Sequence, residues 1–472
     1  MSNALWSWDE LVTASGGQAD GAPSEELPRG ISGASIDTRT LSPGDLFVAL
    51  KDVRDGHEFV PAAFAAGAVA ALVSRNYERK NGDGALIRVD DPLRALEAIG
   101  RAARARTKAR IAAVTGSVGK TGTKEMLRNC LMRCGKVHAS DKSYNNQWGV
   151  PLTLARMPAD TEFGIFEIGM NHANEIMPLS KMVRPHVALI TTVEPVHLGH
   201  FDSVEAIADA KAEIFTGLEP DGVAILNRDN PYFERLRSAA EARGARIVTF
   251  GEHESAQTRL LAVDLEADGS VVQSRLDGKP SSYRIGVPGR HIVQNTLGAL
   301  SAVAALGADT AQAALGLAAL RAPAGRGARE TLKVEGGEIL LVDESYNASP
   351  ASMRAALAVM ATIPRTVARR RIAVLGDMRE LGAHADRLHA ELAPAVVDAG
   401  IDLVFAAGPH MLALYDGLPK HLCGKWAQTA TELRDHLLSA VRAGDAVMVK
   451  GSLGSRMGPL VEALKTHFRP ST

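Results

Sequence analysis

The stretch RIAAVTGSVGKT, residues 110–121, decides the fold of this 472-residue chain. Its first part, Arg110–Val114, is an apolar run typical of a buried strand, and a glycine-rich loop follows it before a helical pattern begins. Successive backbone N–H groups in such a loop, with the N-terminus of the next helix, bind phosphate oxygens. We expect Lys120 to neutralise nucleotide phosphates and the Thr121 hydroxyl to ligate Mg²⁺.

The loop departs from the full Walker spacing at one position, because Val114 stands where a glycine is usual. The strand before it and the helix after it favour a phosphate loop over a glycine-rich turn that carries Gly-Lys-Thr by chance. The residues expected at the phosphates are Thr115, Gly116, Ser117, Val118, Gly119, Lys120, Thr121 and Gly122.

The sequence around this loop alternates strands and helices. Phe163–Ile168 and Val187–Thr192 are further buried-type strands with helical stretches between them. This alternation predicts parallel strands joined by crossover helices. Helices over 291–305 and 310–320 close the unit, and Pro323–Gly327 (PAGRG) is expected to be a linker. The sequence therefore predicts a central phosphate-loop domain over residues 94–324.

A smaller α/β unit is expected on each side of this domain, which gives an α/β protein of three domains. Residues 1–93 begin with a helix capped by Ser7 and Glu10. Three short strands follow at 45–50, 68–74 and 85–89. Residues 325–472 contain strands at 339–342, 372–375, 403–406 and 446–449, typical of a Rossmann-like sheet. Since ligands bind beyond the carboxyl ends of such strands, Asp343, Asp377 and Lys450 are candidate site residues.

Three residues of the central domain break their local pattern. Glu167 is a charge inside the apolar strand FGIFEI, so it is either a Mg²⁺ ligand or an edge residue facing solvent. His197 follows the strand VALITT and is either structural or a ligand. Lys211 occupies an apolar position of a helix over 202–216, so it either points inward near a catalytic site or extends its amine to solvent. Cys130 and Cys134 lie on an apolar helical stripe and are expected to be core thiols.

Composition excludes several classes of protein. Apolar residues make up 46% of the chain and charged residues 23%, as in ordinary globular proteins. The 53 basic and 54 acidic residues nearly cancel, which argues against a broad surface for nucleic acid or anionic membranes. Three cysteines form no disulfide framework. With no apparent signal peptide or membrane helix, we expect a cytoplasmic monomer that neither binds nucleic acid nor inserts into membranes.

The ordered motifs resemble those of the Mur ligase family of peptidoglycan synthesis, across all three domains. Within the family, the closest resemblance is to the branch that uses D-alanyl-D-alanine. Glu344 and Ser349 stand where Asp and Asn are common, and residues 51–57 are one residue shorter than usual. The motifs are IDTRTLSPGDLFVALK (36–51), TGSVGKT (115–121), YNNQWGVPLT (144–153), EIGMNHANEI (167–176), ILNRDN (225–230), GRHIVQN (289–295), DESYNASPASM (343–353), LGDMRELG (375–382) and KGS (450–452).

The resemblance implies an ATP-dependent ligase that forms an amide bond through an acyl phosphate. Its substrates would be UDP-N-acetylmuramoyl-tripeptide, bound by residues 1–93, and D-alanyl-D-alanine, bound by residues 325–472. Two Mg²⁺ ions are implied, one at Thr121 and Glu167 and one at His197 and a carbamylated Lys211. The other residues that it implies are Asn227, Asp229, His291, Asn295, Arg326, Asp343 and Asn347 for ATP, and Ser35, Asp37, Thr38, Arg39, Asn145 and Asn146 for the acceptor substrate.

Two other readings compete with this one. Folylpolyglutamate synthase and the sister Mur enzymes share the same chemistry. A nucleotide switch or scaffold would bind the nucleotide without acyl transfer, but a guanine switch requires Asn-Lys-x-Asp. The nearest stretch here, Asn227-Arg228-Asp229, does not fit that motif.

Overall fold

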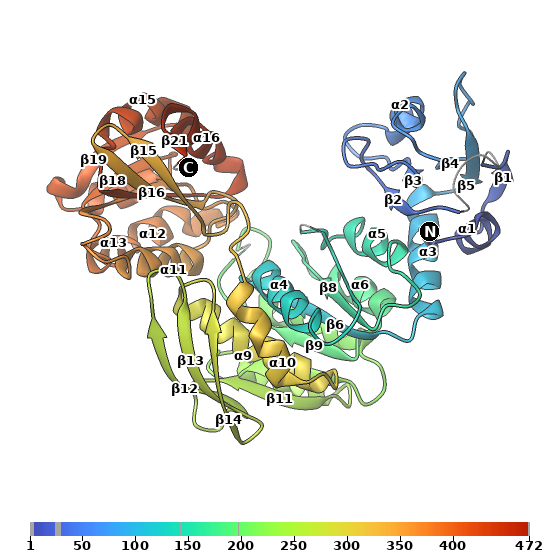
Figure 1. The fold of residues 1–472 in the computed structure, drawn as a ribbon, viewed down its shortest axis with the longest axis horizontal. Helices are drawn as coiled ribbons and strands as arrows, with labels where there is room; N and C mark the ends of the chain where they lie inside the picture. The colour runs from blue at the N-terminus through green and yellow to red at the C-terminus, as the bar shows by residue number, and fades with distance from the viewer. Residues whose placement is uncertain (1–3, 24–29, 142, 197, 471–472) are drawn as a thin grey trace.

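A computed structural model describes residues 4–23, 30–141, 143–196 and 198–470 of the chain. It contains three sheets, one in each of three α/β domains. Figure 1 shows these domains as an open arc, with the central domain between the two terminal ones. Among the described residues, no helix combines the length and the apolar character that crossing a bilayer requires. The predicted α/β architecture of three domains is confirmed.

The N-terminal domain contains a five-stranded sheet in which β2, β3, β4 and β5 are parallel and β1 is antiparallel at one edge. The predicted helix at the start is confirmed, with the Ser7–Glu10 capping box in place. In spatial order the strands are β1 (Gln18–Asp20), β5 (Ala85–Val89), β4 (Ala70–Ser74), β3 (Asp45–Val48) and β2 (Gly33–Ser35). The helices are α1 (Trp8–Ser15), η1 (Gly56–Phe59), α2 (Val60–Ala65) and α3 (Pro92–Arg106).

Helix α3 crosses the expected boundary between the first two domains. It begins at Pro92. The Asp91 side chain accepts hydrogen bonds from backbone N–H groups of the first turn, and proline occupies a position where an N–H would have no partner within the helix. Its apolar face packs in one core with Trp6 of the N-terminal domain and with Leu152 and Ala155 of the central domain. A boundary at residues 93 and 94 therefore falls inside the first turn of a helix that belongs to both domains.

The central domain contains a nine-stranded sheet. Strands β6 to β11 are parallel to one another. The chain passes from β8 to β9 across β6, which lies between them, so the direction in which strands are added to the sheet changes at β6. A ligand crevice forms at such a switch point. In spatial order the strands are β14 (Lys279–Ile285), β13 (Ser270–Leu276), β12 (Thr258–Leu265), β11 (Arg246–Gly251), β10 (Val223–Asn227), β9 (Val187–Ile190), β6 (Arg110–Thr115), β8 (Phe163–Glu167) and β7 (Val137–Ala139).

Helices cover both faces of this sheet because its strands are apolar on both faces. Within β6, Ala112 and Val114 enter one core, while Ile111 and Ala113 enter the other. The first face is covered by α4 (Lys120–Leu131), α9 (Arg290–Ala305), α10 (Thr310–Ala314) and η3 (Leu315–Ala319). The second is covered by α5 (Gly149–Ala155), α6 (Ile176–Val183), α7 (Val204–Ala212), η2 (Glu213–Gly217) and α8 (Phe233–Glu241).

Strands β12, β13 and β14 form an antiparallel meander, which the prediction of a unit of parallel strands did not include. Their burial alternates, so they lack the continuous apolar run of a central strand. The signal was present in Asp277-Gly278, because both residues have positive φ and close a two-residue hairpin between Leu276 and Lys279.

The C-terminal domain confirms the four predicted strands, which are parallel neighbours. In spatial order its strands are β19 (Cys423–Ala427), β18 (Leu403–Ala407), β17 (Arg370–Gly376), β20 (Asp445–Lys450), β16 (Gly337–Glu344), β15 (Ala328–Val334) and β21 (Arg469–Pro470). One face of the sheet is covered by α11 (Pro350–Ala361), η4 (Gly382–His384), α12 (Ala385–Ala390), α13 (Ala393–Asp398), α14 (Met411–Gly417) and η5 (Lys420–Leu422). The other face is covered by α15 (Ala430–Ala440) and α16 (Gly458–His467). The short helix η6 (Leu453–Ser455) follows β20.

Candidate functional site

A cavity of about 1360 Å³ opens at the carboxyl end of β6, and residues of the central domain, the C-terminal domain and the shared helix α3 line it. It includes the loop between β6 and α4, the linker around Gly325 and the loop after β16. Of the residues predicted to contact phosphate, those from Ser117 to Gly122 line the cavity, whereas Thr115 and Gly116 are buried and do not line it.

The loop keeps its shape because two positions require glycine. Gly116 and Gly119 have φ of 150° and 85°. A Cβ at Gly116 would lie 1.9 Å from the Thr191 hydroxyl, and one at Gly119 would lie 2.7 Å from the Asn295 amide nitrogen. Neither contact is sterically possible. The loop is therefore fixed against β9 and α9, with its backbone facing the cavity.

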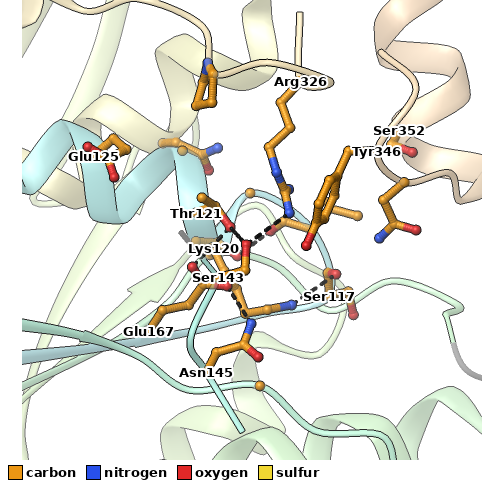
Figure 2. Close-up of a pocket in the computed structure, with 18 of the residues that line it drawn as sticks. Ser117, Lys120, Thr121, Glu125, Ser143, Asn145, Glu167, Arg326, Tyr346 and Ser352 are labelled. Carbon is orange, nitrogen blue, oxygen red and sulfur yellow. Dashed lines mark hydrogen bonds between the residues drawn. The ribbon is translucent and has the colours of Figure 1, made fainter. Parts of the chain in front are cut away.

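Lys120, the first residue of α4, folds back over this loop. Its Nζ donates to the carbonyl oxygen of Gly116 at 2.7 Å, and Figure 2 shows its side chain beside Ser117. Desolvation lowers the pKa of Lys120 from its ordinary value; Glu167 opposes this shift and Arg326 adds to it. The ammonium group therefore lies against the backbone of the phosphate loop.

Glu167 ends β8 at the floor of the same cavity. Because β8 lies between β6 and β7, it is not an edge strand, and Glu167 is only 1% exposed. One carboxylate oxygen accepts from the Thr121 hydroxyl at 2.9 Å and the other from the Asn145 amide at 2.7 Å (Figure 2). The interpretation of a solvent-facing edge residue is therefore wrong. A buried carboxylate beside a hydroxyl offers the hard oxygen ligands that Mg²⁺ prefers.

Arg326 brings the linker into the site. Its guanidinium donates to the Ser143 hydroxyl at 3.3 Å and lies 4.2 Å from the centre of the Tyr346 ring. Ser143 belongs to the central domain and Tyr346 to the C-terminal domain, so one side chain touches both (Figure 2). An arginine placed between a phosphate loop and the C-terminal domain suits phosphate recognition.

Lys211 points inward, as its place in the helical pattern predicted. It lies in the last turn of α7, is 2% exposed, and is not among the residues that line the cavity. Desolvation, with the nearby charge of Lys120, lowers the pKa of its amine well below the ordinary value. Among the described residues no carboxylate pairs with this amine. His197, the other predicted ligand of a second metal, lies outside the described residues.

The burial of this amine predicts a stability effect with a defined pH dependence. We expect Lys211→Met to raise the Tm in buffer purged of CO₂ at neutral pH, by an amount equivalent to about 1 kcal/mol or more. The amine is neutral in both states above the ordinary lysine pKa of ~10.4. Below that pH the unfolded chain takes up the proton more readily, so the native protein loses stability as pH falls towards the lowered pKa.

Thermal unfolding of both proteins at several pH values measures this effect. The difference in Tm should shrink as the pH rises from 7 towards 10. An equal or lower Tm for Lys211→Met at pH 7 would contradict the burial of an uncompensated amine.

The residues predicted to lie near the nucleoside do not all line the cavity. Asn227, His291 and Asn295 line the cavity, and the Asn227 amide donates to the carbonyl oxygen of Thr191 at 3.5 Å. Asp229 does not line it. Its two carboxylate oxygens instead accept from the backbone N–H groups of Glu252 and His253, at 2.7 and 2.8 Å, and so hold the turn after β11.

On the C-terminal side, Asn347 lines the cavity while Asp343 lies behind it. The Asp343 carboxylate accepts from the N–H of Gly325 at 2.9 Å, which ties the linker to the end of β16. Lys450, 2% exposed at the end of β20, pairs with Glu344 at 3.0 Å and donates to the Asn347 carbonyl oxygen at 3.1 Å. Its position at a strand end predicted Lys450 as a site residue, but that position did not predict Glu344 and Asn347 as its partners.

A second cavity lies at the carboxyl edge of the N-terminal sheet. The segments after β3, β4 and β5 line it together with Trp148 of the central domain. Of the predicted residues, Ser35 ends β2 at this same edge and Asp37, Thr38 and Arg39 follow it, although none of them is in the lining of the cavity. Ser35 is buried and bonds to the Asp37 carbonyl oxygen, while the exposed Arg39 pairs with the Asp37 carboxylate at 2.6 Å. Asn145 and Asn146 line the first cavity.

Models of three Mur ligase domains match the chain. The Mur ligase family catalytic domain matches residues 30–104, the Mur ligase middle domain residues 114–303, and the Mur ligase glutamate ligase domain residues 329–453.

The chain is also similar to whole proteins of known activity. It is 35% identical to a UDP-N-acetylmuramoyl-tripeptide–D-alanyl-D-alanine ligase from Escherichia coli, over 93% of this chain and 94% of that one. Identity to the Rickettsia prowazekii protein of the same name is 34%, over 90% and 94% of the two chains. A crystal structure of MurF from Acinetobacter baumannii superposes with a TM-score of 0.82 at 29% identity, covering 99% of this chain and all of that one.

Proposed function

The chain belongs to the Mur ligase family, and we propose that it joins D-alanyl-D-alanine to UDP-N-acetylmuramoyl-tripeptide with consumption of ATP. The observation that carries this proposal is the group of Lys120, Thr121 and Glu167 in a cavity lined by the central domain, the C-terminal domain and helix α3. A site built this way accommodates a nucleotide, an acid and an amine together. Because the reaction consumes ATP, a cytoplasmic location is part of the same proposal.

The reaction proceeds in two steps that the site chemistry favours. An oxygen of the tripeptide carboxylate attacks the γ-phosphorus of ATP, and ADP leaves, which gives an acyl phosphate. The amine of the dipeptide then attacks the acyl carbon, and phosphate leaves with the C–O bond electrons as the nitrogen loses a proton. Both steps build up negative charge on phosphate oxygens, which Lys120 and Arg326 are placed to stabilise.

Thr121 and Glu167 fit a Mg²⁺ ion, because their hydroxyl and carboxylate oxygens lie 2.9 Å apart in the lining of the cavity. The ion would supply further neutralisation of phosphate charge. Among the described residues no cluster of three His, Cys, Asp or Glu side chains forms a metal site. Magnesium in phosphoryl-transfer sites is usually held by one or two carboxylates with substrate oxygens, so such a cluster is not required.

Removing the charge of Glu167 tests this role. We expect Glu167→Gln to lower kcat roughly 10²- to 10³-fold and to raise the Mg²⁺ concentration needed for half-maximal rate, because an amide oxygen is a weaker ligand. Phosphate release at several Mg²⁺ concentrations measures both. Glu205→Gln, an exposed change on α7, is the matched control. An unchanged Mg²⁺ dependence in Glu167→Gln would argue against metal binding there.

A second Mg²⁺ site, with His197 and a carbamylated Lys211, is part of the proposal. Carbamylation joins the neutral amine to CO₂ with loss of one proton, and it would turn a buried amine into an anionic oxygen ligand. The lowered pKa of Lys211 supports this step, because only the neutral amine reacts.

We assign the three substrates to the domains as follows. Residues 1–93 hold the uridine nucleotide at the sheet edge that carries Ser35–Arg39 and the second cavity, residues 94–324 hold ATP, and residues 325–472 hold the dipeptide. The cavity-lining positions of Asn227, His291, Asn295 and Asn347 support ATP contacts. Asp229 and Asp343 would act through the loops that they hold.

Phosphate release tests the function. We expect release that depends on both UDP-N-acetylmuramoyl-tripeptide and D-alanyl-D-alanine, with the pentapeptide product detected by mass. Release with folate and glutamate, or with ATP alone at the same rate, would overturn the proposal in favour of a folylpolyglutamate synthase or a simple nucleotidase.

A further inference from the structure

The large cavity continues beyond the phosphate loop to helix α3, where three charged residues with no assigned role line it. These are Arg94, Glu97 and Arg101. They are spaced three and four residues apart, so they lie on one face of the helix. Helix α3 is the element that joins the N-terminal and central domains, and Figure 1 shows it between them.

The three side chains form one charged group in the lining of the cavity. One oxygen of Glu97 accepts from Arg94 at 3.0 Å and from Arg101 at 3.1 Å. The Glu97 side chain is 12% exposed, whereas those of Arg94 and Arg101 are 74% and 54% exposed. Each guanidinium has five N–H donors, and the bond to Glu97 uses one of them. The group has a net charge of +1 and offers paired donors to a ligand.

The rest of this arm of the cavity suits a short amphipathic chain. Met170, Leu179 and Met182 give it an apolar wall. The carboxylate of Glu175, which also lines it, accepts from the Asn171 N–H at 2.7 Å and from the His172 ring at 3.1 Å. The negative charge of Glu175 is therefore already paired with hydrogen-bond donors of its own loop.

The arm lies on the path between the two cavities. At the start of α3, Leu93 lines the second cavity and Arg94 the first. In the segment before α5, Trp148 lines the second cavity and Gln147 the first. Suppose that the substrate has its nucleotide in the second cavity and its reacting carboxylate at Lys120 and Glu167. Its peptide then passes Arg94 and Arg101.

We propose that Arg94 and Arg101 bind a carboxylate of the acceptor peptide other than the one that is activated. This inference rests on the proposed function. A single carboxylate matches a site of net charge +1, whereas a diphosphate would meet repulsion from Glu97. Such a carboxylate has two sources in the acceptor: the side chain of a diaminopimelyl third residue, and the α-carboxylate of a γ-linked glutamate. A lysyl third residue lacks the first of these.

The test is the kinetics of Arg94→Gln and Arg101→Gln with three acceptors. They are the diaminopimelyl tripeptide, the lysyl tripeptide, and the diaminopimelyl tripeptide whose glutamate α-carboxylate is amidated. For the diaminopimelyl acceptor we expect KM to rise roughly 10- to 100-fold in each variant with kcat little changed, because a charge-assisted hydrogen bond is lost. Arg110→Gln is the control, since Arg110 is exposed at the opposite end of β6.

The acceptors identify the source of the carboxylate. A penalty that disappears with the lysyl acceptor assigns the site to the diaminopimelyl side chain, and one that disappears with the amidated acceptor assigns it to glutamate. An equal penalty with all three acceptors, or none with any, overturns the inference. Absence of turnover by the unmodified enzyme with every acceptor would instead reject the proposed function. Because both arginines are exposed, we expect the variants to fold, and circular dichroism tests this.

Discussion

Replacing Lys120 with alanine is expected to abolish turnover, leaving no more than a few per cent of activity. The Lys120 ammonium is the cation nearest to the phosphate-binding backbone of the loop, and it starts the helix whose N-terminus faces the same phosphates. Without it, charge that develops on the transferred phosphoryl group is left in a partly desolvated cavity. Steady-state phosphate release with saturating substrates measures the loss.

Two observations accompany this prediction. Lys108→Ala, an exposed change before β6, should leave the rate unchanged. Binding of ATP to Lys120→Ala, measured by calorimetry, should weaken less than the rate falls, because the charge matters most in the transition state. Activity above a few per cent would show that Lys120 has no such role.

Replacing Lys211 with alanine is expected to be nearly as damaging, but for a different reason. The substitution removes the proposed carbamate and leaves a small space at the end of α7. Short carboxylates such as formate or acetate should enter this space and restore part of the activity by serving as the missing anionic ligand. The measurement is the rate of phosphate release as a function of added carboxylate.

Lys120→Ala is the matched control for this rescue, because a carboxylate cannot replace a cation. A direct measurement complements it: ¹³CO₂ should give a carbamate signal in the unmodified protein that Lys211→Ala lacks. Full activity of Lys211→Ala without added carboxylate would reject a metal-ligand role for this lysine.

The sequence predicted the parts of this protein that depend on local pattern. The strand, loop and helix around Lys120 follow from residue order alone. Glu167 and Lys211 were found because each places a charge at an apolar position, and exposed fractions of 1% and 2% confirm that both are buried. A residue that contradicts its local pattern is informative because the fold must compensate for it.

Features that depend on tertiary contacts could not be read in this way. Nothing local distinguishes Asp229, which holds a turn, from a nucleotide ligand. The partners of Lys450 come from a strand about one hundred residues earlier in the chain, so the pair appears only when β16 and β20 are adjacent. Arg94 and Arg101 resemble ordinary surface charges of a helix until a cavity is seen to reach them.

The shared core around α3 determines which parts of the enzyme can move separately. The Trp6 ring nitrogen donates to the Ala155 carbonyl oxygen, and Arg156 donates to that of Ala34, so the first two domains are bonded on both sides of the helix. The C-terminal cores, in contrast, include one central-domain side chain among the described residues, that of Leu198. We therefore expect the first two domains to move as one unit and the C-terminal domain to move relative to them about residues 321–327, which connect it to the central domain.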